Sequence, residues 1–263
     1  MKSNNLEKIQ ALKIAKNKFK NWYIFPLIYL KLYFRSIAKI TSKENIIIKL
    51  RTKSTDFLTF VNIGIFDEYL KNKIDIQNKD IIIDIGGHVG LFALYASQFC
   101  KNGQIYSFEP VIENYNLLLK NVEDNNLTNI KVFNTAVSKN NGKINLFLNS
   151  DQAAHSIFNK TTLSKEVNSI TLQNIFEVNN IKNCDLLKID CEGAEYEILG
   201  NLPTKYFAKI QKMVIECHFV KTKKDLFNNL KISLKQQNFE LVEKELENEL
   251  VIIFGKNVGE DQD

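Results

Sequence analysis

Acidic side chains and a histidine close two short apolar runs in the second half of the chain. Asp190 follows the run at 185–189, and Glu192 stands two residues further on. Glu216 and His218 close the run that ends at residue 215. Residues two apart share a face where a strand continues. Histidine titrates nearest neutrality and carboxylates accept protons, so we take Asp190, His218 and Glu192 as candidate catalytic residues. Glu216 is a candidate substrate contact.

A glycine-rich turn ends an earlier apolar run, where the sequence reads Asp84-Ile85-Gly86-Gly87-His88-Val89-Gly90. Glycine allows positive φ and lets a ligand come close to the backbone. A helix that begins after the turn offers free N–H groups to a carboxylate or phosphate. The turn therefore predicts a cofactor loop, although a tight strand-to-helix turn without a ligand has the same composition.

An acid after the next apolar run strengthens the cofactor prediction. Glu109 follows Asp84 by 25 residues, and a carboxylate at roughly this spacing, about 20 residues, binds ribose hydroxyls in nucleotide-binding folds. Pro110 suits the first turn of the helix that follows. The dinucleotide pattern G-x-G-x-x-G would need glycine where Ile85 stands. The missing glycine disfavours a NAD(P)-dependent oxidoreductase on a Rossmann-like fold, which stays the alternative function.

A polar stretch at 149–156 contains another histidine. His155 and Ser156 stand at its end. Such a stretch between two elements is either an active-site loop or an ordinary solvent-exposed loop. On the first interpretation His155 and Ser156 contact the substrate.

The candidate residues need a scaffold that brings the ends of several strands together. Short apolar runs at 81–84, 104–108, 130–133, 185–189 and 213–215 alternate with stretches of helical period. This alternation is typical of an α/β fold, with a mostly parallel sheet covered by helices on both faces. Ligands then bind beyond the carboxyl ends of the strands.

The regions on either side of this alternation predict further elements. We expect helix in residues 1–40, a strand at Asn45–Leu50, a helix capped by Asp56, a hairpin-like turn at residues 140–142, and two closing strands at 239–242 and 250–254. The expected domains are an N-terminal helical and β extension at 1–55, a catalytic domain at 56–256 and a C-terminal tail at 257–263.

Composition places the chain among ordinary globular proteins. Of its 263 residues, 44% are hydrophobic and 25% charged, which excludes a disordered or fibrous chain. The net charge of +5 is too weak to predict a nucleic-acid partner. Four cysteines without a C-x-x-C pair predict neither a disulfide framework nor a zinc site, and indicate reduced thiols in a cytoplasmic protein.

The segment at 22–35 is the part of the sequence that could contact a membrane. Residues 22–30 are nearly all apolar, but Lys31 and Arg35 interrupt the run, which is shorter than the roughly 20 residues of a spanning helix. No small-residue cleavage site follows, so we expect no signal peptide. The segment is either an amphipathic helix packed on the domain or a peripheral membrane contact. The aromatic residues of such a contact are Trp22, Phe25 and Tyr29.

Taken together, the motifs resemble the FkbM family of S-adenosylmethionine-dependent methyltransferases. The resemblance rests on the segment from Asp56 to Tyr69, the turn at 84–90, Phe108-Glu109-Pro110, the segment from Leu187 to Glu195, and Glu216-Cys217-His218. It implies a class I methyltransferase fold, which is a seven-stranded sheet whose last strand runs antiparallel. It also implies methyl transfer to a hydroxyl of a sugar, glycan or small metabolite.

The same resemblance assigns cofactor contacts. The glycine loop, with Asp84, Gly86, Gly87, His88 and Gly90, is implied at the methionine end, Glu109 at the ribose, and Asn134, Thr135 and Ala136 near the adenine. Pro110 and Asp190 are implied as further cofactor contacts. His88 and Gly87 replace the Asn and Ala that are common in the family. No Asn/Asp-Pro-Pro-aromatic motif follows Ile189, which disfavours amino-methylation. A divalent cation held by Asp190, Glu192 and Glu216 stays open, although no ligand spacing demands one.

Overall fold

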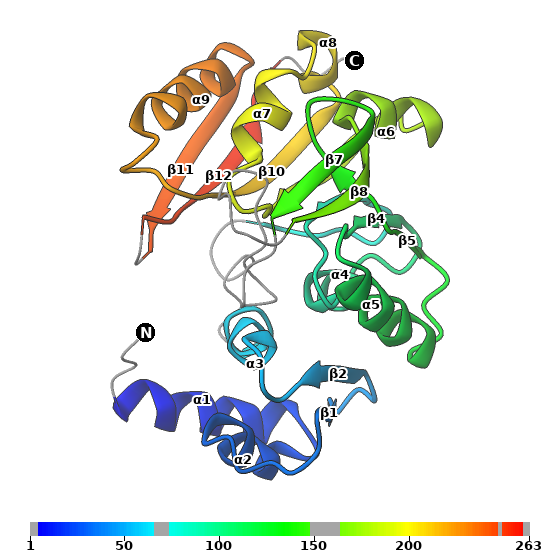
Figure 1. The fold of residues 1–263 in the computed structure, drawn as a ribbon, viewed down its shortest axis with the longest axis vertical. Coiled ribbons are helices and arrows are strands. Elements are labelled where there is room, and N and C mark those ends of the chain that lie inside the picture. Colours follow the sequence, from blue (N-terminus) through cyan, green and yellow to red (C-terminus); the bar gives the residue numbers. More distant parts are fainter. Residues whose placement is uncertain (1–4, 66–73, 148–163, 247–248, 260–263) are drawn as a thin grey trace.

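The centre of the molecule is a twisted sheet with one antiparallel strand. A computed structural model describes residues 5–65, 74–147, 164–246 and 249–259. Seven of the described strands form one sheet in the order β11-β12-β10-β9-β3-β4-β5 (Figure 1). They are β3 (Ile81–Ile85), β4 (Gln104–Phe108), β5 (Ile130–Phe133), β9 (Cys184–Ile189), β10 (Ile210–Cys217), β11 (Phe239–Glu245) and β12 (Val251–Asn257). Among these strands only β12 runs against its neighbours. The expected class I sheet is confirmed.

The sheet separates two hydrophobic cores. Ile82 and Leu186 face one core, whereas the next residues along the same strands, Ile83 and Leu187, face the other. Successive side chains of a strand point to opposite faces, so wholly apolar runs bury both faces. The first core contains α4 (Leu91–Ala96) and α5 (Ile112–Asp124). The second contains α6 (Leu172–Val178), α7 (Glu195–Gly200), α8 (Thr204–Phe207) and α9 (Lys224–Gln236).

The strand order reverses beside β3. The chain proceeds from β3 to β4 and β5 on one side, and then crosses to β9 and β10 on the other. Parallel pairing of β3 with both β4 and β9 puts the carboxyl ends of these strands at one edge. Ligands bind at such a switch point in open α/β sheets. The fold therefore brings together the polar residues that follow these strands.

The N-terminal unit lies at one end of the molecule, away from the large sheet (Figure 1). It consists of α1 (Asn5–Lys18), a short 3-10 turn η1 (Trp22–Ile24), α2 (Phe25–Tyr29), and a hairpin of β1 (Ile37–Thr41) and β2 (Ile47–Arg51). Of the described residues before position 40, 5–18 and 22–29 are helical as expected, whereas 30–36 form turns and irregular chain and β1 begins at Ile37. Phe25 is 3% exposed and packs edge-on against Phe57 and Phe60, so it is not available for a membrane contact. Among the described residues no helix is long and apolar enough to cross a membrane.

A helix follows the N-terminal unit in the chain. α3 (Asp56–Phe60) continues as the π-helical turn η2 (Val61–Ile65). The expected cap at Asp56 is wrong, because Thr55 holds the N-cap position. The Asp56 carboxylate instead accepts hydrogen bonds from the backbone N–H and the guanidinium of Arg51. A paired guanidinium binds a carboxylate more strongly than a neutral backbone N–H does.

A second, three-stranded sheet has the order β6-β8-β7. Its strands are β6 (Ala136–Val137), β7 (Gly142–Phe147) and β8 (Ser164–Ile170). The expected hairpin at residues 140–142 is wrong, because β8 lies between β6 and β7 and pairs with both. β8 was missed because its sequence, SKEVNSI, is polar and mostly exposed.

Candidate active site

A cavity of about 250 Å³ lies where β3, β4, β9 and β10 end. The described residues that line it include most of those singled out from the sequence. They are Gly86, His88, Glu109, Pro110, Ala136, Asp190, Glu192, Glu216 and His218. Residues more than a hundred positions apart in the chain thus meet at one site, as the switch point of the sheet requires.

The glycine loop fits tightly against the neighbouring strands. Gly86 has φ of 78°, and a Cβ there would lie 1.7 Å from the carbonyl oxygen of Asp190. A Cβ on Gly87 would lie 2.2 Å from Ser107 Oγ. Gly90 has φ of 87° and is the N-cap of α4. Gly87 and Gly90 do not line the cavity, so they shape the loop from behind while Gly86 and His88 face the opening.

Lys188 is a buried cation beneath the loop. Its side chain is 3% exposed, and Nζ lies 3.1 Å from Asp84 Oδ1 and 3.8 Å from Asp190 Oδ2. It also donates a hydrogen bond to the carbonyl oxygen of Gly86 at 2.7 Å. Burial opposes its charge, but Asp84 and Asp190 raise the pKa of Lys188 overall. Asp84 does not line the cavity: it pairs with Lys188 and accepts a hydrogen bond from Ser107.

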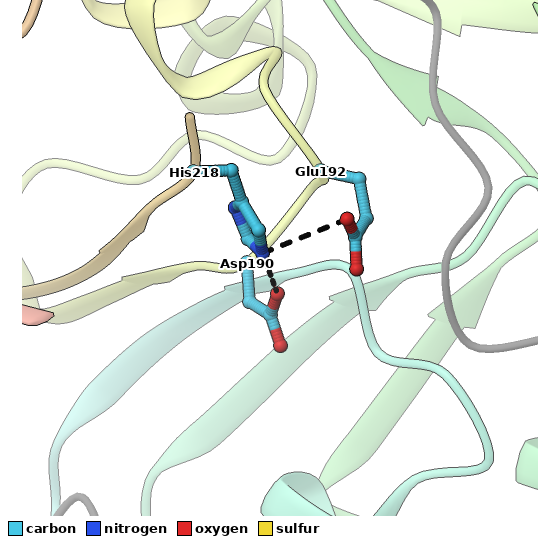
Figure 2. Close-up of side chains that lie close together, drawn as sticks. All are labelled: Asp190, Glu192 and His218. Atoms are coloured by element: carbon cyan, nitrogen blue, oxygen red, sulfur yellow. Dashed lines mark ion pairs between the residues drawn. The ribbon is translucent and has the colours of Figure 1, made fainter. Parts of the chain in front are cut away.

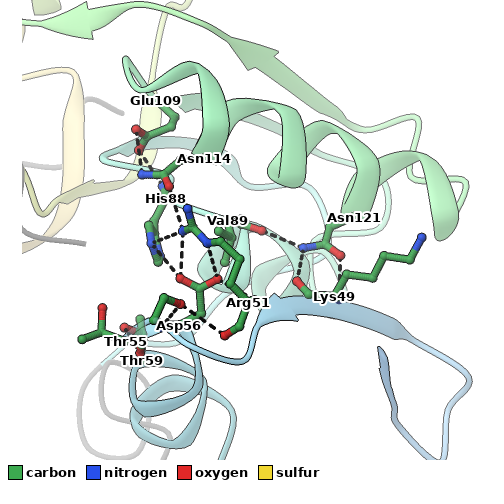
Figure 3. A network of polar contacts seen from close by, with 11 residues as sticks. Lys49, Arg51, Thr55, Asp56, Thr59, His88, Val89, Glu109, Asn114 and Asn121 are labelled. Carbon is green, nitrogen blue, oxygen red and sulfur yellow. Dashed lines mark hydrogen bonds and ion pairs between the residues drawn. The ribbon is translucent and has the colours of Figure 1, made fainter. Parts of the chain in front are cut away.

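Glu109 is held with both oxygens in fixed directions (Figure 3). Oε2 accepts the backbone N–H of His88 at 2.8 Å, and Oε1 accepts that of Val111 at 2.9 Å. The Asn114 amide donates a further bond to Oε1 at 3.3 Å. Burial raises the pKa of Glu109 above its ordinary value. The carboxyl group is thus preorganised at the cavity wall, where a ribose would be recognised.

Arg51 connects the N-terminal unit to this wall (Figure 3). Its guanidinium donates to both oxygens of Asp56 at 2.8–2.9 Å and to Asn114 Oδ1 at 2.8 Å. Nη2 also lies 3.2 Å from Nε2 of His88, which is 3.3 Å from Asp56 Oδ1. Asp56 is fully buried, and although burial opposes its ionisation, His88 and Arg51 hold its pKa well below the ordinary value. Arg51 and Asp56 therefore fix His88 and Asn114, which in turn fix Glu109.

Three candidate catalytic side chains converge on one point (Figure 2). Nε2 of His218 lies 3.9 Å from Asp190 Oδ1 and 3.7 Å from Glu192 Oε2. On its other side, Nδ1 lies 3.5 Å from Oε1 of Glu195. Glu195 is fully buried and also accepts the backbone N–H groups of His218 and Gly193. It holds the imidazole with Nε2 toward the cavity.

The carboxylates around His218 decide its charge. Burial alone would lower its pKa, but the ion pair with Glu195 and the charges of Glu192 and Asp190 raise the pKa of His218 to about 10. Burial likewise opposes the charge of Asp190, yet Lys188 and His218 hold its pKa below the ordinary value. At neutral pH His218 is an imidazolium and Asp190 is a carboxylate.

The pKa of Glu216 is shifted in the opposite direction to that of Asp190. Burial and the charge of Asp190 raise the pKa of Glu216 well above its ordinary value. The charge of Asp190 thus favours the protonated form of Glu216. Asp190, Glu192 and His218 also offer one ligand atom each within 4.8 Å of one another, which is compatible with a cation. Glu216, named for such a site from the sequence, is replaced in this set by His218.

Comparison with known proteins identifies the family. Residues 84–241, more than half of the chain, match the family described as the methyltransferase FkbM domain. The chain belongs to the FkbM methyltransferase family. Among its relatives are Methyltransferase 1 of Beauveria bassiana, 21% identical over 179 residues, and methyltransferase sdnD of Sordaria araneosa, 23% identical over 190. These matches cover 60% of this chain and 72% and 73% of the two proteins.

A solved structure agrees with this assignment at the level of the fold. The methyltransferase FkbM from Methylobacillus flagellatus superposes with a TM-score of 0.52 at 13% identity, covering 95% of this chain and 59% of that one. This FkbM methyltransferase chain therefore has a methyltransferase fold, and its family implies S-adenosylmethionine as the methyl donor. None of these matches supports the NAD(P)-dependent alternative.

The cavity of this FkbM methyltransferase suits a positively charged donor. Four carboxyl groups line it, those of Glu109, Asp190, Glu192 and Glu216, whereas the described lining contains no lysine or arginine. S-adenosylmethionine carries a sulfonium and an ammonium group, which an ionised carboxylate such as that of Asp190 attracts, and the positive charge of His218 offsets part of this attraction. The donor set therefore fits the residues present.

Some site residues were not expected from the sequence, and some expected ones lie elsewhere. Arg51, Asn114, Lys188 and Glu195 were missed; a lysine inside the apolar run LLKID was the signal that could have revealed Lys188. Asn134 does not line the cavity but donates to the carbonyl oxygens of residues 109 and 110. His155 and Ser156 lie outside the described residues.

Proposed function

We propose that this enzyme transfers the methyl group of S-adenosylmethionine to a hydroxyl oxygen of a sugar, glycan or small metabolite. The observation that carries the proposal is that Asp190, Glu192 and His218 line the same cavity as Gly86 and Glu109. Proton-accepting groups thus stand beside the residues that would hold the donor. A hydroxyl acceptor needs such groups because its proton must leave when the new C–O bond forms.

The chain's own residues supply binding and orientation. Gly86 and His88 would hold the methionine end of the donor, and Glu109 would accept hydrogen bonds from the ribose. S-adenosylmethionine supplies an activated methyl group on a positively charged sulfur. Holding two reactants in line and excluding water contributes on the order of 7–11 kcal/mol to such a transfer. Fixed groups such as Glu109 are therefore central to the rate.

Asp190 is the proposed proton acceptor. It is ionised at neutral pH, whereas His218 already carries its proton. The C–O bond forms as the C–S bond breaks, and the hydroxyl proton passes to the Asp190 carboxylate. A weak base suffices because an oxygen that has gained a methyl group is strongly acidic. His218 then positions Asp190 and Glu192 through its positive charge rather than by removing the proton.

A divalent cation at Asp190, Glu192 and His218 is the competing mechanism for the same reaction. Their ligand atoms lie within 4.8 Å of one another, as a cation site requires. The cation would replace the proton on His218 and acidify the acceptor hydroxyl. Dialysis against a chelator separates the two mechanisms: unchanged turnover supports Asp190 as the base, and a loss restored by Mg²⁺ or Mn²⁺ supports the cation.

The proposal is tested by isotope-labelled methyl transfer with Asp190→Asn. The full chain is supplied with labelled S-adenosylmethionine and a panel of sugars, nucleotide sugars and polyols. We expect label in a hydroxyl-derived methoxy group. Asp190→Asn should lower turnover by about 10²–10⁴-fold, the usual contribution of a positioned base, while S-adenosylhomocysteine still binds.

The matched control is Asp225→Asn, an exposed acid in the first turn of α9. It should leave turnover unchanged. Label found only on nitrogen or carbon acceptors would refute the O-methyltransferase proposal, and full activity of Asp190→Asn would refute the role of Asp190.

A further inference from the structure

Charge is distributed very unevenly along the chain. Residues 1–55 contain thirteen lysines and arginines but only two acidic residues. Residues 56–263 contain twenty-two lysines and arginines and twenty-eight acidic residues. The N-terminal segment therefore carries a formal charge of +11 and the remainder −6. The modest overall charge of +5 conceals this asymmetry. Such a split between parts of one chain is typical of a protein that binds a negatively charged surface.

The basic N-terminal unit also carries an exposed apolar patch. The patch consists of Tyr23, Leu27, Leu30, Leu32 and Phe34, whose exposed fractions run from 42% to 85%. All five lie in or next to α2, at the end of the molecule away from the large sheet (Figure 1). Isolated exposed apolar residues are ordinary, but five within twelve positions mark an interaction surface.

The backbone holds this patch outward. α2 ends with Lys31 at φ of 58°, and the N–H of Leu32 donates to the carbonyl oxygen of Leu27 while that of Lys31 donates to Ile28. This is the Schellman pattern, in which the residue after the left-handed position commonly contacts the one five before it. Ile28 on the opposite side of the helix is 2% exposed. The core thus anchors one side of α2 and leaves the other side exposed.

Two cations adjoin the patch, and others lie elsewhere in the same unit. Lys31 and Arg35 are exposed, and the Arg35 guanidinium lies 5.4 Å from the ring of Phe34. Further exposed lysines in the N-terminal unit are Lys13, Lys16, Lys20, Lys39, Lys43 and Lys53, whereas Glu44 is its one exposed acid among the residues whose burial the structure describes. Apolar side chains bordered by lysine and arginine match the acyl chains and headgroups of an anionic bilayer.

We propose that the apolar patch and its cations dock the enzyme on an anionic membrane surface. Nucleic acid explains the cations but not Leu27, Leu30 and Leu32, because it is bound through polar and stacking side chains. A dimer formed through this patch would cover the apolar residues, but it would bring together two N-terminal segments that each carry a formal charge of +11. A lipid surface accounts for both features. The proposal does not depend on the acceptor, because lipid binding is measured without methyl transfer.

Vesicle co-sedimentation tests the proposal on the full chain. One set of vesicles contains phosphatidylcholine alone, and the other contains phosphatidylcholine and phosphatidylglycerol in equal amounts. We expect binding to the anionic vesicles only, weakening as salt screens the charges. The double variant Leu32→Ser/Phe34→Ser should lower the partition coefficient at least tenfold, and Lys31→Glu/Arg35→Glu should do the same.

The matched control is Leu226→Ser/Ile232→Ser, which removes two exposed apolar residues from α9. It should sediment like the wild type, and all variants should bind S-adenosylhomocysteine equally. Wild-type binding by the patch variants would overturn the proposal. So would dimerisation that Leu32→Ser/Phe34→Ser abolishes, or binding of a labelled RNA at the same salt with no binding to anionic vesicles.

Discussion

At the scale of single residues, Lys188 is the buried cation on which two carboxylates depend. It lies 3.1 Å from Asp84 and 3.8 Å from Asp190 and is 3% exposed. Lys188→Met keeps the length of the side chain but leaves both carboxylates uncompensated. Removing one partner of a buried ion pair typically costs about 3–5 kcal/mol. We expect the free energy of unfolding, measured by urea denaturation, to fall by this amount.

The control for this prediction is Lys139→Met. Lys139 is 46% exposed and lies 3.0 Å from Glu197, and exposed pairs contribute about 0–1 kcal/mol. Equal losses in the two variants would show that burial does not govern the role of Lys188.

His218 should make stability depend on pH in one direction. Its pKa is raised to about 10 in the folded chain, against about 6.5 in an unfolded one. The charged form of His218 therefore stabilises the folded chain fully below about pH 6.5. This stabilisation is lost as the pH rises through about 10, because the imidazole then loses its proton. We expect the difference in unfolding free energy between wild type and His218→Gln to shrink steadily across this window.

A second variant ties this dependence to its cause. Glu195→Gln removes the buried carboxylate that holds His218, so the imidazole titration followed by NMR should move to lower pH. A pH-independent difference between wild type and His218→Gln would contradict the assigned charge.

At the scale of elements, Asn121 of α5 and Asn125 at the C-cap of this helix hold strand β2 in the way a neighbouring strand would. Asn121 accepts the N–H of Lys49 at 2.8 Å and donates to its carbonyl oxygen at 3.0 Å. Asn125 makes the same pair of bonds with Ile47 at 2.7 and 2.6 Å. Four helical residues rise about 6 Å, close to the roughly 6.8 Å of two strand residues. The spacing of the two asparagines therefore matches alternate residues of β2.

Removing one asparagine should loosen the strand. Asn121→Ala leaves the Lys49 backbone and the carbonyl oxygen of Val89 without this partner. Unsatisfied buried groups cost about 1–3 kcal/mol, so we expect that loss of unfolding free energy and faster hydrogen exchange in β2. Asn116→Ala, exposed on the same helix, should change stability by less than about 0.5 kcal/mol. Unchanged exchange in β2 would contradict the proposed role of Asn121.

The helices and strands that could be predicted are those whose own residues show a clear hydrophobic pattern. The run at 130–133 matches β5 residue for residue, because an apolar run between turns leaves few alternatives. β8 alternates polar residues and faces solvent, so it has no such pattern. Charged side chains are mostly exposed in proteins, so no local pattern marks Lys188 and Glu195 as buried. Arg51 reaches the site through tertiary contacts that no local pattern contains.

At the scale of the whole molecule, the N-terminal unit supports one wall of the cavity from behind, in addition to carrying a basic surface. Arg51 at the end of β2 contacts His88 on the glycine loop and Asn114 on α5. Both of these hold Glu109, which lines the cavity. An element outside the residues matched to the family thus orders the wall at which the donor would bind.

Arg51→Gln should therefore weaken cofactor binding although Arg51 does not line the cavity. The variant loses a charged donor to Asp56 and Asn114, and such hydrogen bonds contribute about 1.5–3 kcal/mol. Because 1.4 kcal/mol is tenfold in affinity, we expect the dissociation constant of S-adenosylhomocysteine, measured by calorimetry, to rise at least about tenfold. Lys49→Gln, on the same strand but paired with Asp124 away from the cavity, should bind like the wild type. Equal affinities of wild type and Arg51→Gln would mean that Glu109 is held without the N-terminal unit.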